Sequence, residues 1–165
     1  PESETAVHLP KDTKFNIPPY LPDTPLVQRD MWKMYNNLAE TDKQIAAVLQ
    51  QLKNDGLLEE TIVFFYADHG GPLPRQKRLI YDSGLKVPLV VRFPHKKHAG
   101  TTDDQLISFI DFAPTTLALA GQSIPKVMHG QDFFDNQQRD YIHAAADRFD
   151  GFTDVIRAVK DKRFK

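Results

Sequence analysis

The chain has 165 residues, of which 41% are hydrophobic and 26% are charged, with a formal net charge of −1. This composition is ordinary for a soluble globular protein, and the near-zero charge gives no reason to expect nucleic acid or an acidic membrane surface as a partner. There is no cysteine, which excludes disulfides, thiolate metal ligands and a cysteine nucleophile within the chain. We expect no membrane-spanning segment, because no run of about 18 apolar residues occurs.

The chain opens with a proline-rich stretch that predicts an extended approach segment. Thr24 followed by Pro25 is a helix start signal, in which a capping residue precedes a proline at the first helical position. Apolar residues then recur at roughly helical spacing, and Gly56 supplies a stop. We therefore expect a long amphipathic helix over residues 25–54.

A continuous run of β-branched and aromatic residues, TIVFFYA, occupies positions 61–67 and leads directly into Asp68, His69 and two glycines. An apolar run of this kind is typical of a strand that is buried on both faces of a parallel sheet. In open α/β sheets, ligand sites lie just beyond the carboxyl ends of such strands. We therefore expect the side chains of Asp68 and His69 to face one ion.

The next segments continue the same type of architecture. A polar, proline-containing loop covers about residues 70–78, and residues 87–93 predict a second parallel strand. A second helix is expected over residues 105–120, where Gly121 ends it. The order helix, strand, loop, strand, helix indicates the α/β class.

The character of the chain changes after residue 130. Residues 141–146 and 155–159 predict two short strands on either side of a turn-rich segment. We interpret this part as a small antiparallel sheet. The chain is therefore expected to divide into an α/β part, residues 1–130, and an appended part, residues 131–165.

Five segments agree in order and spacing with a single known pattern. They are residues 61–70, Lys77, residues 81–92 (YDSGLKVPLVVR), residues 110–121 (IDFAPTTLALAG) and residues 129–133 (HGQDF). Together they resemble the C-terminal half of a sulfatase catalytic domain; the fourth is similar to the family's D-x-x-P-T-x-x-x-x-A-G helix and the fifth to its G-x-S-[FL] turn. The resemblance covers about residues 20–165. It implies the alkaline phosphatase superfamily fold, a large α/β sandwich with a small antiparallel C-terminal subdomain.

Within this family, the spacing of Asp68 and Lys77 and the G-x-P-x-P character of residues 70–74 are most similar to the heparan N-sulfatase (sulfamidase) branch. The resemblance implies a hydrolase of sulfate esters or sulfamates whose substrate is a sulfated, glycosaminoglycan-like saccharide. It also implies a periplasmic, secreted or lysosomal compartment.

The resemblance implies roles for three residues. Asp68 is the expected metal ligand, since its carboxylate oxygen suits Ca²⁺, with another divalent metal as the alternative. His69 stands where the family carries Asn or His, and it either ligates the same metal or donates a hydrogen bond to a sulfate oxygen. Lys77 matches the sulfate-binding lysine, with Arg75 or Arg78 as alternatives. His69 and Lys77 are thus the expected catalytic residues of this chain.

The chain departs from the family in one respect. The family nucleophile is a formylglycine made from the Cys or Ser of a C/S-x-P-S-R motif, and two acids on an early strand complete the metal site. Neither feature occurs here. We therefore expect both in an N-terminal half outside this chain, and we expect the chain alone not to turn over a sulfate ester.

Two alternatives remain open. One is a phosphonate or phosphodiester hydrolase of the same superfamily, which usually needs further Asp and His ligands for a second metal. The other is a non-catalytic fragment or binding module that keeps the fold without the chemistry. The missing nucleophile motif is the reason to keep the second alternative.

Overall fold

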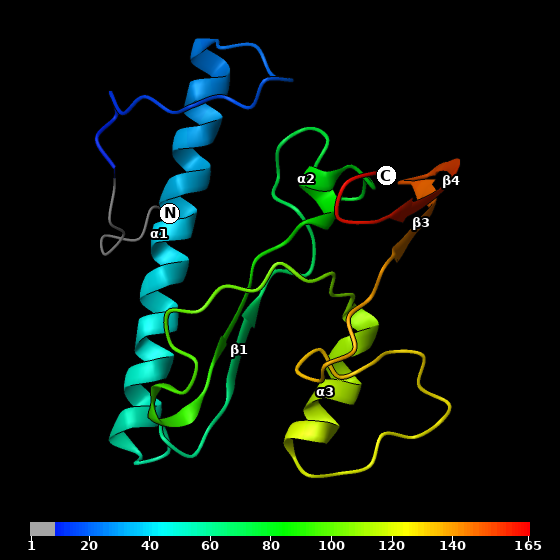
Figure 1. Ribbon diagram of the computed structural model, residues 1–165. Coiled ribbons are helices and arrows are strands. Elements are labelled where there is room, and N and C mark those ends of the chain that lie inside the picture. Colours follow the sequence, from blue (N-terminus) through cyan, green and yellow to red (C-terminus); the bar gives the residue numbers. More distant parts are fainter. Residues whose placement is uncertain (1–8) are drawn as a thin grey trace. The chain divides into compact units, whose positions relative to one another are not determined.

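A computed structural model describes residues 9–165 of the chain (Figure 1). The chain forms two compact units. The first consists of the chain up to Phe65 together with Val90–Ala99, and the second of Tyr66–Leu89 together with Gly100–Lys165. Helices and strands alternate along the first half of the chain, in keeping with the predicted α/β class. Among residues 9–165, no helix has both the length and the apolar character that a membrane span requires.

The regular elements follow one another with short connections in most places. In chain order they are α1 (Pro25–Asn54), β1 (Val63–Tyr66), α2 (Asp82–Leu85), β2 (Leu89–Arg92), η1 (Pro94–Lys96), η2 (Phe109–Asp111), α3 (Phe112–Leu119), β3 (Ile142–Phe149) and β4 (Phe152–Lys160). The two η elements are single 3₁₀ turns. The short helix α2 was not among the predicted elements.

The long helix α1 has the bounds that the sequence predicts. The Thr24 hydroxyl oxygen accepts the backbone N–H of Val27 at 3.4 Å, which satisfies one of the free donors of the first turn. At the other end, Gly56 has a φ of +71°. The N–H of Gly56 donates to the carbonyl oxygen of Lys53 and that of Leu57 to the carbonyl oxygen of Leu52, the two backbone hydrogen bonds of a Schellman motif. Both the start and the stop signal are therefore confirmed.

Strands β1 and β2 pair with each other, but not in the predicted parallel arrangement. Ala67, which follows β1, donates a backbone hydrogen bond to Pro88, which precedes β2, at 3.4 Å. The Arg92 guanidinium, at the end of β2, donates to the carbonyl oxygen of Leu58, ahead of β1, at 2.7 Å. The two strands therefore run in opposite directions. The reason is that the connection between them folds as a local loop and does not form the crossover that a parallel pair requires.

The sequence predicts covering layers on both faces of β1, and the described residues do not supply them. Phe65 and Tyr66 of β1 are 38% and 46% exposed, and Val90 of β2 is 58% exposed. On the first unit, apolar side chains of α1 and β1 line an open hollow of about 260 Å³. Two short strands and one helix cannot cover one another, so these apolar surfaces face solvent.

The second unit has its core beside α3. Thr115 is fully buried, and Phe133 is 4% exposed. The rings of Tyr66, Phe109 and Phe133 surround that of Phe112, with ring centroids 4.8 to 6.0 Å from its own. Such tilted aromatic pairs contribute packing beyond the apolar area that they bury.

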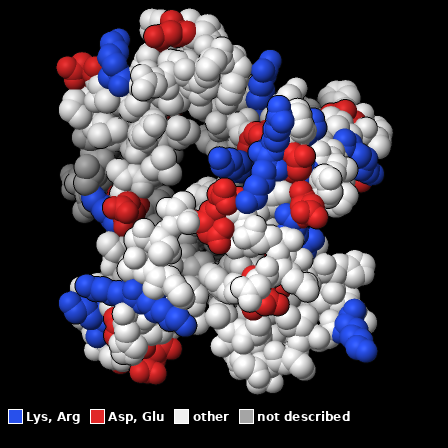
Figure 2. All heavy atoms as spheres, in the orientation of Figure 1, with Lys and Arg blue, Asp and Glu red and all other residues white. Residues whose placement is uncertain are grey.

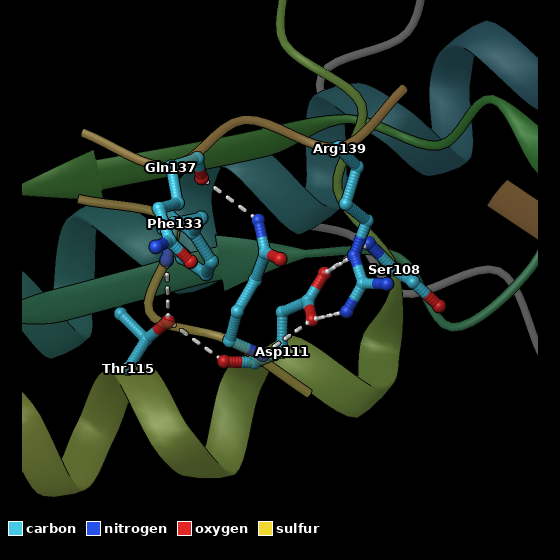
Figure 3. A network of polar contacts seen from close by, with 7 residues as sticks. Ser108, Asp111, Thr115, Phe133, Gln137 and Arg139 are labelled. Atoms are coloured by element: carbon cyan, nitrogen blue, oxygen red, sulfur yellow. Dashed lines mark hydrogen bonds and ion pairs between the residues drawn. The ribbon is translucent and has the colours of Figure 1, made fainter. Parts of the chain in front are cut away.

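The carboxylate of Asp111 is the centre of a polar network in this core (Figure 3). Asp111 is 1% exposed. Its oxygens accept the backbone N–H groups of Ser108 and Gln131, each at 2.9 Å, and the Nε–H of Arg139 at 3.0 Å. A second guanidinium N–H of Arg139 donates to the other carboxylate oxygen. The buried charge is therefore both neutralised and hydrogen-bonded, as a buried carboxylate must be.

The Thr115 hydroxyl extends this network by one further step. It donates to the carbonyl oxygen of Asp111 at 2.7 Å and accepts the backbone N–H of Phe133 at 3.1 Å. The segment after Gly130 is thus held against α3 by hydrogen bonds. A Cβ at Gly130 would lie 1.8 Å from the carbonyl oxygen of Ile110, so only glycine permits this approach.

The helix predicted over residues 105–120 is shorter than expected, because residues 105–108 are not helical. Pro114 explains the late start: in a longer helix its ring would clash with the carbonyl of Ile110 and leave it without a donor. Ser108 instead forms a capping box that opens the helical segment. Gly121, with a φ of +69°, ends α3 as predicted.

Strands β3 and β4 form the predicted antiparallel pair, and both are longer than expected. Phe149 lies opposite Phe152, so the turn contains only Asp150 and Gly151, a dipeptide that is typical of tight hairpins. The register changes once, after Ala146, where the strand pairing is irregular. The paired strands are called the C-terminal hairpin below.

The Asp111 network predicts the effect of one substitution. Asp111→Asn removes the charge that balances Arg139 and turns one acceptor oxygen into a donor, so we expect the natural protein to lose about 3 kcal/mol of its free energy of unfolding. Asp42→Asn, at an exposed position of α1, is the control and should change it by less than about 0.5 kcal/mol. Urea unfolding followed by circular dichroism measures both. Equal losses of unfolding free energy in the two variants would contradict the conclusion that the Asp111 network stabilises this core.

The exposed apolar surfaces of α1, β1 and β2 predict the behaviour of residues 1–165 expressed alone. We expect this polypeptide to associate or to unfold without a cooperative transition, because uncovered strands and apolar faces invite contact between chains. Size-exclusion chromatography with light scattering and calorimetry would measure this. A monodisperse monomer with one cooperative thermal transition would contradict the expectation.

Candidate functional site

Asp68 and His69 follow β1 directly, and the structure brings their side chains together. The imidazole Nε2 lies 3.5 Å from a carboxylate oxygen of Asp68, and Nδ1 lies 2.8 Å from the carbonyl oxygen of Gly70. Because a carbonyl can only accept, Nδ1 carries the proton, and in the neutral ring Nε2 presents its lone pair beside the Asp68 carboxylate. Asp68 is 82% exposed and His69 is 41% exposed. The pair thus offers two donor atoms to a ligand in solution.

The turn after His69 is held by backbone contacts. The N–H of Gly70 donates to the carbonyl oxygen of Gly84 at 3.1 Å, and the N–H of Lys77 donates to that of Gly71 at 3.2 Å. A Cβ on Gly70 would lie 2.2 Å from the carbonyl oxygen of Ser83. The glycine therefore lets α2 pack directly on the turn that connects His69 to Lys77.

Lys77 is exposed, and its environment differs from that of the two neighbouring cations. The guanidinium of Arg78 pairs with Asp150, and that of Arg75 lies over the ring of Tyr81 at 5.6 Å from its centroid. Within residues 9–165, the Lys77 ammonium has no hydrogen-bond or ion-pair partner. Three cations, Arg75, Lys77 and Arg78, were candidates for binding an anion. Of these, Lys77 is the one whose charged group makes no hydrogen bond, ion pair or ring contact with another described residue.

The helix α2 carries an acid that sequence analysis did not single out. The carboxylate of Asp82 accepts hydrogen bonds from the ammonium groups of Lys160, at 2.8 Å, and Lys165, at 3.2 Å. The bond from Lys160, followed by that from Lys165, holds the pKa of the Asp82 carboxyl below its usual range, although desolvation acts in the opposite direction. No local pattern predicts this cluster, because Asp82 is more than seventy residues away from both lysines.

Charged side chains of both signs are interspersed on the face drawn in Figure 2. This distribution agrees with the net charge of −1. Near the candidate site, Arg78 is balanced by Asp150, Arg75 lies over Tyr81, and Lys77 has no hydrogen-bond or ion-pair partner within residues 9–165.

The donor set at Asp68 and His69 fits part of a metal site. Among residues 9–165, no group of three or more His, Asp or Glu side chains is arranged to hold a metal ion. Ca²⁺ takes about six to eight oxygen ligands. The exposed Asp68 carboxylate would supply one or two of these, and His69 would lie at the edge of the ion, so the other ligands must come from water or from residues beyond those described.

The chain is similar to known sulfatases. Residues 4–122 match the family model described as Sulfatase. The chain is 66% identical over 167 residues to an ulvan-active sulfatase of Formosa agariphila, an alignment that covers 99% of this chain and 28% of that protein. It is 33% identical over 102 residues to the N-sulphoglucosamine sulphohydrolase of Homo sapiens, which covers 61% of this chain and 20% of that protein.

A third relative is the N-acetylglucosamine-6-O-sulfatase of Bacteroides thetaiotaomicron, 33% identical over 93 residues, with 54% of this chain and 17% of that protein covered. The chain thus spans less than a third of the length of each of these three relatives. The resemblance derived from the sequence motifs agrees with these matches, including the heparan N-sulfatase branch.

The close packing of α2 on the turn predicts the effect of a single methyl group. A Cβ at Gly84 would lie 2.1 Å from the carbonyl oxygen of Leu79 and 2.4 Å from that of Gln76, so Gly84→Ala should displace the turn. Gly151→Ala is the matched control, since nothing lies within 4 Å of its Cβ. Hydrogen–deuterium exchange of peptides that cover residues 70–79 should accelerate only in Gly84→Ala. Unchanged exchange in both variants would contradict the packing described.

Proposed function

Since this chain belongs to the sulfatase family, we propose that it forms part of an enzyme that hydrolyses sulfate groups on saccharides. The observation that carries the proposal is that the exposed Asp68 and His69 side chains lie together at the start of the loop that also carries Lys77. The backbone N–H of Lys77 is hydrogen-bonded to Gly71 in that loop. The activity is that of the whole protein, of which this chain supplies one portion. Residues 1–130 are proposed as part of the catalytic α/β domain and residues 131–165 as the start of a smaller subdomain.

The chemistry of sulfate hydrolysis explains the need for these residue types. The sulfate group is a tetrahedral anion, and negative charge develops further on its oxygens and on the leaving atom as the bond breaks. Positive groups that are already in place stabilise this charge. Lys77 is proposed to hold a sulfate oxygen through its ammonium, which acts as a point charge with three donors. As the alternative to ligating the metal, His69 would donate a hydrogen bond from Nε2 to the same sulfate group.

Asp68 and His69 are the residues of this chain proposed to contact a divalent metal, with calcium as the proposed ion. When bound, such an ion neutralises charge on the transferred group. The proposed nucleophile, a formylglycine, and the remaining acids of the metal site belong to the part of the enzyme outside this chain. This chain alone is therefore proposed to be inactive.

The names of the relatives bear on the substrate. One relative is named for activity on ulvan and another for N-sulphoglucosamine, so a sulfated polysaccharide or one of its units is the proposed substrate class. The 66% identity makes ulvan the first polysaccharide to test. Matches to proteins named as sulfatases favour this function over a phosphonate or phosphodiester hydrolase and over a binding module. A periplasmic, secreted or lysosomal compartment is part of the same proposal.

Asp68→Asn in the natural protein tests the metal role. We expect turnover of a sulfated saccharide to fall by about a hundredfold or more and bound calcium to decrease, because a charged ligand is lost. Measured without calcium, the thermal transition should change little, since the Asp68 side chain is 82% exposed. Turnover assays, elemental analysis and calorimetry provide the three measurements. Normal turnover with normal calcium content would remove Asp68 from the site.

Lys77→Ala tests the anion role. The substitution should raise the inhibition constant for inorganic sulfate and lower turnover, because the ammonium interacts with the anion in the ground state and in the transition state. Lys77→Arg should restore only part of the loss, since a planar fork does not replace a point charge. Arg75→Ala is the matched control and should have little effect. A larger effect of Arg75→Ala or Arg78→Ala would assign the anion to another cation.

A further inference from the structure

The turn that carries Lys77 is tied to the C-terminal hairpin on both sides. The residue after Lys77, Arg78, pairs with Asp150 in the tight turn of the hairpin. At the opposite end of the hairpin, Lys160 is the last residue of β4 and pairs with Asp82, the first residue of α2. The hairpin thus contacts the segment of the candidate site at its tip and at its base.

The contacts of Asp82 are better sheltered than those of an ordinary surface ion pair. The side chains of Lys160 and Lys165 are 23% and 25% exposed, and both donate to the one carboxylate. The Lys165 ammonium also donates to the carbonyl oxygen of Ile80, which adds a backbone contact just ahead of α2. A carboxylate that accepts two charge-assisted hydrogen bonds from partly buried donors holds its neighbours more firmly than an exposed pair does.

A nearby pair offers a comparison within the same unit. Asp104 pairs with Lys162 at 3.0 Å, and these side chains are 89% and 49% exposed. The two pairs therefore use the same residue types, and their lysines lie only two positions apart in the sequence. No hydrogen bond joins the Asp104–Lys162 pair to the turn at residues 70–77. Asp82, in contrast, lies in α2, which is hydrogen-bonded to that turn.

The path from Asp82 to Lys77 runs through backbone contacts. Asp82 opens α2, whose Gly84 carbonyl accepts the N–H of Gly70 at 3.1 Å. The hydroxyl of Ser83, also in α2, donates to the carbonyl oxygen of Arg75 at 2.5 Å. A shift of α2 would therefore move Gly70, the residue after His69, and Arg75, two residues before Lys77.

We propose that Asp82 is a positioning residue for Lys77. Its ion pairs with Lys160 and Lys165 fix α2 on the C-terminal hairpin, and α2 in turn fixes the backbone from which the Lys77 ammonium reaches a sulfate group. This inference rests on the proposed function of Lys77. It gives the hairpin a role in the anion site although none of its side chains needs to contact the substrate.

The first test measures how firmly the Asp82 ion pairs hold α2 and the turn, and it does not depend on activity. In the natural protein, Asp82→Asn should accelerate hydrogen–deuterium exchange of peptides that cover residues 69–81. The reason is that the N–H of Gly70 loses its fixed acceptor at Gly84, and the carbonyl oxygen of Arg75 loses the Ser83 hydroxyl that holds the turn. Asp82→Glu, which keeps the charge, should restore most of the protection. Asp104→Asn is the matched control and should leave these peptides unchanged. Unchanged exchange in Asp82→Asn would overturn the inference.

The second test asks whether Asp82 acts through Lys77. Asp82→Asn should raise the inhibition constant for inorganic sulfate by about three- to tenfold, and by less than about twofold when Lys77→Ala is already present. A purely structural role would give the same factor in both backgrounds and would overturn the inference. Asp104→Asn should change the constant in neither background.

The two tests separate this inference from the proposed function. If Lys77→Ala alone leaves sulfate inhibition unchanged, the anion role of Lys77 fails and the positioning role fails with it, whatever the exchange data show. If Lys77→Ala weakens sulfate binding while Asp82→Asn changes neither exchange nor inhibition, the proposed function stands and only the role of Asp82 is lost.

Discussion

The second unit depends on the burial of one carboxylate. Asp111 is 1% exposed, and a charge in that position is tolerated only if every oxygen is hydrogen-bonded and an opposite charge lies beside it. The partners come from three separate places in the chain, at Ser108, Gln131 and Arg139. These segments must therefore arrive together, which fixes the start of α3 and, through Arg139, the point from which the C-terminal hairpin departs.

From that point, a series of contacts leads to the candidate site. The hairpin begins three residues after Arg139 and ends at Lys160, which meets Asp82 at the start of α2. Helix α2 then packs on Gly70, immediately after His69. The residues that carry the proposed chemistry are thus exposed, yet their backbone is held by contacts that lead back to the ion pair of Asp82 and to the buried ion pair of Asp111. This arrangement satisfies the usual requirement that exposed reactive groups rest on rigid support.

Local signals in the sequence predicted much of this structure. The cap at Thr24 and the stop at Gly56 each act through a few neighbouring residues, and both were confirmed. The turn-rich segment expected between the last two strands narrows in the structure to Asp150 and Gly151. The direction of β2 was predicted wrongly, and the ion pairs of Asp82 were not predicted, because both depend on contacts between residues that are not neighbours in the chain. The late start of α3 is different: Ser108 followed three residues later by Asp111 is a capping-box pattern that the sequence already contained. Asp68 and His69 were predicted to face one ion; their side chains lie 3.5 Å apart, and the role of the two residues at a metal stays a prediction.

Each of the two compact units is built from two separate segments of the chain, which limits how they can be recombined by engineering or in evolution. The polypeptide leaves the first unit after Phe65, returns at Val90 and leaves it again after Ala99. No single cut in the chain separates the units, so neither can be cloned, exchanged or lost as one contiguous block. The segment Tyr66–Leu89 contains all three proposed site residues, so it is a contiguous block, called the cassette here, that could be grafted between homologues. A graft that omits the acids and lysines of the C-terminal hairpin would transfer the cassette without the elements that hold its shape.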